Sequence, residues 1–259
     1  MTVDRKRYAD LIHDLAMRAV DAAEKTPDAA GHRPRVGETW FRLTQVLPAA
    51  RVLLVGGTAP DVSDEALAAL VDPKVRVTDG RGHTRGVYRQ LASHIFERAG
   101  VEVPMATGRG HEVVGADVAE QAWAILNASP DADVFPLDHL PPGEGALHVQ
   151  DVDDGLDHWT YCELVALHAW DALTRRHGSQ AGRDRVAAAA RFHQGHTQPD
   201  YTTYQPWALA AFLEADDTAA FAEQQLHDVR HHLAIEGGAG AVVVALLLSD
   251  AYASWMAKG

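Results

Sequence analysis

The chain has 259 residues, and its 47% hydrophobic content is sufficient for one large core. Thirty-six acidic residues outnumber 23 lysines and arginines, so the formal charge is −13 at pH 7. This acidic balance argues against nucleic acid or an anionic membrane as a partner. The 15 histidines supply many groups that ligate metals or move protons near neutrality. We predict a single mainly helical domain, residues 1–259, that acts as an enzyme on a small-molecule substrate.

Cysteine usage and apolar runs indicate the compartment. The sequence contains one cysteine, Cys162, and therefore forms no internal disulfide and no paired-thiol zinc site. Its first residues are charged and lack the apolar stretch of a signal peptide. Residues 239–253 most resemble a membrane span, but Ser249 and Asp250 interrupt them before the about 20 residues that are needed. We expect a cytoplasmic protein and leave open whether it forms a homo-oligomer.

The first elements along the chain are predicted from apolar spacing. Apolar positions recur at helical intervals over residues 4–24, which predicts a first helix. A second amphipathic helix is predicted over residues 38–47, and Pro48 cannot lie inside it because proline lacks a backbone donor.

Residues 48–79 allow two interpretations. A strand at 51–57, a helix at 65–71 and a strand at 74–79 would make the N-terminal half α/β and leave the C-terminal half helical. Alternatively, Pro48 opens a short helix that a glycine pair closes. We favour the helical interpretation because the remainder of the chain is helical.

Helical periodicity is strongest after residue 84. The helices predicted from it cover residues 87–98, 118–126, 159–173, 186–193, 206–212, 222–233 and 241–248. Thr84 is placed to cap the first of these helices and Gly100 to end it. Helix starts about 35 residues apart favour stacked helical hairpins, in a curved array or an α/α barrel-like domain.

The last predicted helix is apolar on every side. It should therefore lie at the centre of the fold. Asp250 belongs to this helix, and a carboxylate in such surroundings needs a buried partner. We predict a histidine or an arginine in that role.

A first candidate metal site follows the predicted helix at 186–193. His193 and His196 can point the same way if that helix continues, and Asp200 is close enough in sequence to orient one imidazole. Tyr204 completes the segment as a candidate catalytic group. The alternative is a capped helix end in which His193 is an ordinary hydrogen-bonded core residue.

A second pair of candidate metal ligands lies on the predicted helix at 222–233. His227 and His231 are four residues apart, as in two-histidine helical metal sites, and Asp228 is a candidate proton carrier. At about 100° per residue, both histidines point away from the apolar side of this helix. They would be solvated on an ordinary surface helix, and they would face a cavity in a helical barrel.

The glycine-rich segment 79–86 is a candidate anion site. It leads into a predicted helix whose free N–H groups favour an anion, and Arg81, His83 and Arg85 add donors. The segment has neither a Walker lysine nor a Rossmann glycine pattern, so no nucleotide cofactor is expected. The alternative is a tight turn that needs glycine at positive φ.

An acidic cluster at Asp151, Asp153 and Asp154 precedes the predicted helix at 159–173. Carboxylates this close repel, so one should stay protonated near neutrality or all should surround a cation. The segment resembles the DxDD motif of class II terpene cyclases, which are built from α-helical hairpins. The resemblance covers four residues in a helical context. It implies that Asp153 protonates an alkene with the other two acids as companions.

Three hypotheses on function follow. The first is an enzyme of hydrolase or lyase type that acts on a small substrate, for which an anion is one option. A divalent metal (Zn, Fe or Mn) would be bound in a His/Asp pocket by His193, His196, Asp200, His227 and His231. The second is a metal-independent cyclase or isomerase that uses Asp153 and a histidine on an apolar substrate lined by Trp207 and other aromatics. The third is a non-enzymatic helical-repeat interaction module.

Overall fold

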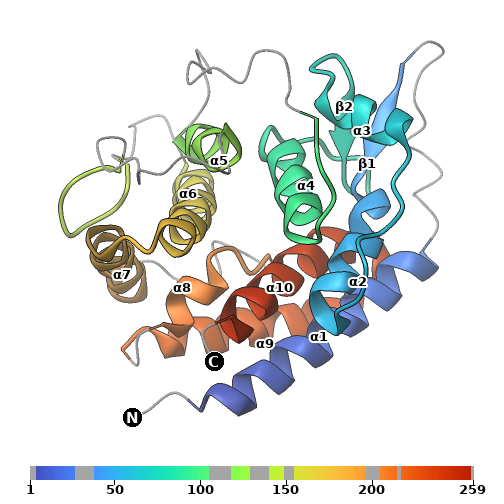
Figure 1. Cartoon of the computed structure of the whole chain (residues 1–259). Helices are drawn as coiled ribbons and strands as arrows, with labels where there is room; N and C mark the ends of the chain where they lie inside the picture. Colours follow the sequence, from blue (N-terminus) through green and yellow to red (C-terminus); the bar gives the residue numbers. More distant parts are fainter. Residues whose placement is uncertain are drawn as a thin grey trace. The chain divides into compact units, whose positions relative to one another are not determined.

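The computed structural model describes residues 4–26, 38–104, 118–128, 140–148, 155–196, 205–214 and 217–257. These residues are mainly helical, which confirms the predicted fold class (Figure 1). The chain divides into two compact units, and each is described separately. Unit 1 comprises Met1–Arg5 and Gly110–Asp228, and unit 2 comprises Lys6–Arg109 and Val229–Gly259. The predicted single domain stays a prediction.

Unit 1 is built around one long helix. Its helices are α5 (Val118–Ala128), α6 (Leu156–His177), α7 (Gln180–His196), α8 (Leu209–Leu213) and the first part of α9 (Ala219–Glu236). Helices α5, α7 and α8 all pack against α6, and α8 also contacts α7. Helix α6 therefore forms the centre of this unit.

Helices α6 and α7 form a helical hairpin. Gly178 follows the last residue of α6 with φ of 63°, in the left-handed region that glycine adopts without strain. Its N–H and that of Ser179 bond to carbonyls of the last turn of α6, and α7 begins immediately afterwards at Gln180. Gly178 therefore ends α6 and starts the turn of the hairpin.

Unit 2 combines helices with a small parallel sheet. Its elements are α1 (Arg5–Lys25, from Lys6), β1 (Trp40–Arg42), η1 (Leu43–Val46), α2 (Leu47–Val55), α3 (Asp64–Val71), β2 (Arg76–Thr78), α4 (Val87–Arg98), the end of α9, η4 (Gly237–Gly240) and α10 (Ala241–Met256). Helix α10 packs against α2 and α4, and its residues 241–251 are all buried. The prediction that the most apolar helix lies at the centre is confirmed for this unit.

Residues 51–55 belong to a helix, α2, rather than to a strand. Pro48 lies in the first turn of α2, where its missing N–H costs nothing, and Gly56 with φ of 73° closes the helix. Of the α/β alternative, the helix at 65–71 is present as α3 and the strand at 74–79 as β2, whereas the strand at 51–57 is wrong.

The predicted helix over residues 38–47 is wrong in its first half. Trp40–Arg42 form β1, which pairs in parallel with β2 so that Phe41 lies opposite Val77. Burial alternates along β1, with Phe41 buried between two half-buried neighbours, and this period of two is that of a strand. A 3-10 helix, η1, then continues into α2.

The expected cap of α4 is also wrong. Thr84 forms an isolated antiparallel bridge with Thr78, and Gly86 occupies the cap position without a side-chain hydrogen bond. Gly100 follows the end of α4 with φ of 83°, which confirms the predicted stop. Among the described residues, no helix is both long and apolar enough to cross a membrane.

Candidate functional site

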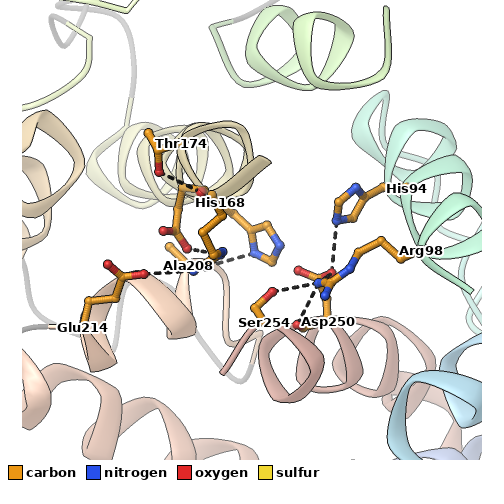
Figure 2. A network of polar contacts seen from close by, with 10 residues as sticks. His94, Arg98, His168, Thr174, Ala208, Glu214, Asp250 and Ser254 are labelled. Atoms are coloured by element: carbon orange, nitrogen blue, oxygen red, sulfur yellow. Dashed lines mark hydrogen bonds and ion pairs between the residues drawn. The ribbon is translucent and has the colours of Figure 1, made fainter. Parts of the chain in front are cut away.

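Asp250 lies in the middle of α10 and is 1% exposed. Its Oδ1 is 3.0 Å from Nε2 of His94, which α4 contributes and which is 4% exposed (Figure 2). Arg98 donates to the same carboxylate from one turn further along α4. Both partner types predicted for Asp250 are therefore present, and that prediction is confirmed.

Arg98 ties this cluster to the end of α10. Its Nη1 also donates to the backbone oxygen of Asp250 at 3.1 Å and to Oγ of Ser254 at 2.7 Å. The guanidinium brings a permanent positive charge to the buried carboxylate, which offsets much of the cost of removing that carboxylate from water. Asp250 is thus the centre of a compact charge-balanced cluster, called here the Asp250 cluster: Asp250, His94, Arg98 and Ser254.

The Asp250 cluster defines the tautomer of His94. A carboxylate only accepts hydrogen bonds, so the contact places a proton on Nε2 of His94. In the neutral imidazole, Nδ1 is then the basic nitrogen. A carboxylate that orients an imidazole and stabilises its protonated form is the arrangement that makes histidine an effective proton carrier.

Unit 1 contains a second buried acid and imidazole. Nε2 of His193 on α7 is 3.0 Å from Oε2 of Glu163 on α6, and both side chains are 0% exposed. The same oxygen accepts the backbone N–H of Leu147 at 2.8 Å. Within the described residues, no hydrogen bond reaches the other oxygen, Oε1.

Trp207, a predicted substrate-binding residue, is a core side chain of unit 1. It is 0% exposed and donates through Nε1 to Gln205 at 3.1 Å. Its ring meets the ring of His168 edge-on, and the ring of His168 stacks on that of Trp123 with the two ring centroids 5.3 Å apart. Nδ1 of His168 accepts the backbone N–H of Ala208, which stabilises the left-handed φ of 57° there (Figure 2).

The glycine-rich segment folds around Asp79. Oδ1 of Asp79 accepts the N–H groups of Arg81 and His83, both at 2.8 Å, and Oδ2 lies 3.2 Å from Nδ1 of His83. The chain's own carboxylate therefore occupies these two N–H groups, while the anion site predicted at the start of the following helix stays a prediction. His83 and Arg85 are exposed.

Arg81 instead turns toward the end of α9. A Cβ on Gly240 would lie 2.7 Å from Nη2 of Arg81 and 2.8 Å from Nε2 of His232, so glycine is needed for this approach. Burial, and secondarily the positive charge of Arg81, lower the pKa of His232 from 6.5 to about 4. Arg81 therefore faces a neutral imidazole at ordinary pH.

The predicted metal ligands lie in different surroundings. Helix α7 does continue through His196, but His193 is buried on Glu163 whereas His196 is exposed and stacks on Phe192. On α9, His227 and His231 are exposed, in agreement with the predicted orientation away from the apolar side.

Asp228, the predicted proton carrier beside His227 and His231, accepts a hydrogen bond from Gln224 at 2.9 Å. Asp153, Asp200 and Tyr204 lie outside the described residues, as does the whole DxDD-like segment. In the described part of the chain, no three His, Cys, Asp or Glu residues are grouped to hold a metal.

Sequence reasoning missed His94 and Glu163. Each is an ionisable residue among apolar neighbours on a helix, which is the same pattern that points to Asp250. His94 lies three residues after Leu91 and directly before Ile95, and Glu163 lies between Cys162 and Leu164. Applying the Asp250 criterion to every helix would have found both.

No known family model, no curated protein and no solved structure matches the chain. Its function is therefore inferred from its own residues.

Proposed function

We propose that the protein is an enzyme that moves a proton during its reaction through His94, with Asp250 as the orienting carboxylate and Arg98 as the charge that holds it. One observation carries this proposal: the 3.0 Å contact between His94 and Asp250 in the centre of an apolar helix. Such pairs are common in sites that perform general acid and base catalysis.

Energetics support a functional role for this cluster. Burying a carboxylate and a cation is expensive, and well-packed apolar residues of similar volume often give equal or greater stability. The residues of α10 that precede Ser249 and Asp250 are all valine, leucine and alanine, so an apolar side chain at position 250 would continue the pattern of the helix. We infer that the cluster serves chemistry at the expense of stability.

Access to Nδ1 of His94 is the first test. Diethyl pyrocarbonate acylates unprotonated imidazole nitrogens, and peptide mass spectrometry identifies the modified residue. Nδ1 of His94 is itself buried, so we expect His94 of the folded protein to react at neutral pH more slowly than an exposed histidine but faster than one that is 0% exposed. The reaction should be slower still in Asp250→Asn because the ring loses the carboxylate that orients it. His196, exposed on α7, serves as the reactive control and His193, 0% exposed, as the protected one.

Failure of His94 to react while His196 reacts would overturn the proposal, since a base that no small reagent reaches cannot meet a substrate.

A direct test of catalysis is to incubate the native protein with a mixture of small molecules and to analyse that mixture by mass spectrometry. A compound that the native protein consumes and His94→Gln does not consume identifies the substrate. The same compound should protect His94 from the reagent.

The metal-assisted mechanism is a second candidate, supported by the spacing of His227 and His231 on α9. Metal analysis of protein purified without a polyhistidine tag tests it, and only trace Zn, Fe or Mn after reconstitution would contradict it.

We further propose a cytoplasmic location, which the single, buried Cys162 supports. Secretion of the full-length chain in its source cells would contradict that location.

A further inference from the structure

Unit 1 contains a cavity of about 630 Å³ beside α7, within the range of small-molecule sites. The side chains that the following argument uses are Glu144, Asp184, Arg185, Arg191, Phe192 and His196, which line it. This cavity, called here the α7 pocket, has no role in the proton transfer proposed above.

Arg185 fixes one wall of the α7 pocket. Its Nε donates to the carbonyl of Pro141 at 2.6 Å, Nη1 to that of Gly145 at 2.9 Å and Nη2 to that of Ala146 at 2.8 Å. Three bonds from one planar group hold this extended segment in a single position relative to α7. Because these donors are occupied, Arg185 positions the wall rather than binding a ligand.

Helix α6 fastens the same wall at two more points. Glu163 accepts the N–H of Leu147, and Nε1 of Trp159 donates to the carbonyl of His148 at 3.3 Å. The buried contact of Glu163 with His193 therefore supports the segment that carries Glu144. A wall held in this way requires little ordering when a ligand arrives, which favours binding.

Phe192 and His196 add aromatic rings to the lining of the pocket. His196 stacks on Phe192 with ring centroids 4.5 Å apart and planes 10° from parallel. Trp159 supports Phe192 edge-on at 6.5 Å, and a bond of Nδ1 to the carbonyl of Phe192 fixes the His196 ring. The pair offers a flat π surface to a second ring.

Two opposite charges at the pocket remain available. Arg191 and Glu144 both line it and are both exposed. In the described chain, neither forms a hydrogen bond or ion pair. Asp184, by contrast, accepts a hydrogen bond from Gln180. A ligand with both a carboxylate and an ammonium group would satisfy Arg191 and Glu144 together.

We propose that the α7 pocket binds a small zwitterion that carries an aromatic ring, in the manner of a free aromatic amino acid. The carboxylate of the ligand pairs with Arg191, its ammonium group with Glu144, and its ring lies on the Phe192 and His196 pair. This inference is independent of the proposed function, and each can fail alone.

The proposal is tested by titrating the full chain with L-phenylalanine, L-tyrosine and L-tryptophan. The NMR chemical shifts of the backbone amides report binding. We expect at least one to bind with a Kd of about 0.1–1 mM and to shift residues of α7. Phenethylamine lacks the carboxylate and 3-phenylpropanoate lacks the ammonium group. Each should bind about tenfold more weakly than phenylalanine, because one charge-assisted contact is lost.

Variants locate the site. Arg191→Gln and Glu144→Gln remove one charge each from exposed positions and should each weaken binding about tenfold. Arg230→Gln makes the same change at an exposed arginine of α9 and should have no effect. No saturable binding of any of the three amino acids would overturn the proposal. Equal binding by Arg191→Gln and Arg230→Gln, or by phenethylamine and phenylalanine, would also overturn it.

Discussion

The two units each bury an imidazole against a carboxylate at 3.0 Å, but they balance the charge differently. Asp250 receives a permanent cation from Arg98 in addition to His94. Glu163 receives His193 and one backbone N–H, while the guanidinium of Arg185 bonds to carbonyls instead.

This difference separates a group suited to chemistry from one suited to architecture. Arg98 balances the negative charge of Asp250 while His94 is neutral, so this carboxylate does not need a protonated His94 as its counter-ion. The Glu163 pair joins α6, α7 and the segment at Leu147, and a change in its protonation would disturb all three. This contrast supports the proposal of proton transfer at the first pair, whereas the contacts of the second pair support the wall at Leu147.

The largest effect is expected for Asp250→Asn. This change removes the negative charge that faces Arg98 while keeping the volume, and it leaves an amide oxygen to accept from both His94 and Arg98. The free energy of unfolding should fall by about 3–5 kcal/mol. Urea unfolding followed by circular dichroism measures it. Asp14→Asn is the matched control, because Asp14 is 65% exposed and its pair with Arg18 should contribute less than about 1 kcal/mol.

A third buried imidazole faces a cation instead of a carboxylate, and it should respond to acid. The pKa of His232 is about 4 in the folded protein, against 6.5 when unfolded, because of burial and Arg81. The unfolded chain thus binds the extra proton between these values. Stability should fall as pH decreases from about 6.5 to 4, by up to about 3 kcal/mol, and this contribution should level off below pH 4.

Unfolding at pH 7, 6, 5 and 4.5 measures this dependence. His232→Phe should flatten it, whereas His231→Gln, which removes the exposed neighbouring imidazole, should leave it. Equal slopes for His232→Phe and the native chain would contradict the assignment to His232.

Glu163→Gln should cost less than Asp250→Asn. An amide oxygen still accepts from Leu147 and His193, but the new NH2 group is buried where Oε1 has no hydrogen bond to a described residue. We expect a loss of about 1–3 kcal/mol. A double-mutant cycle with His193→Phe measures the coupling of the pair. A loss from Glu163→Gln as large as that from Asp250→Asn would remove the distinction drawn between the two pairs.

The sequence predicts helices and single demanding residues well, and spatial groups poorly. The sequence identifies Asp250 because a carboxylate in an apolar helix needs a buried partner. The residue types that can serve as this partner, histidine and arginine, follow from its negative charge. The partner's position, His94 on α4, is 156 residues away and depends on how helices pack. The spacing of residues within one helix does not indicate which residue of a distant helix will lie beside them.

The glycine-rich segment 79–86 has an internal contact that its composition does not indicate. The segment at Arg81 and His83 has the composition of an anion site, but Asp79, two and four residues before them, closes onto their N–H groups. An aspartate that begins such a segment is a local competitor for the donors. The strand at Trp40–Arg42 was missed because three residues are too few to display a period of two.

The smallest effect is expected where histidines are exposed. His227→Gln and His231→Gln on α9 should each change the free energy of unfolding by no more than about 0.5 kcal/mol, because solvated side chains away from other contacts contribute little. Repeating urea unfolding with added Zn²⁺ sharpens the contrast with the buried imidazoles. If the native chain gains stability that both variants lose, these two histidines bind metal together as their spacing predicts. If zinc acts equally on all three proteins, the exposed pair does not bind this metal and belongs to an ordinary solvated face.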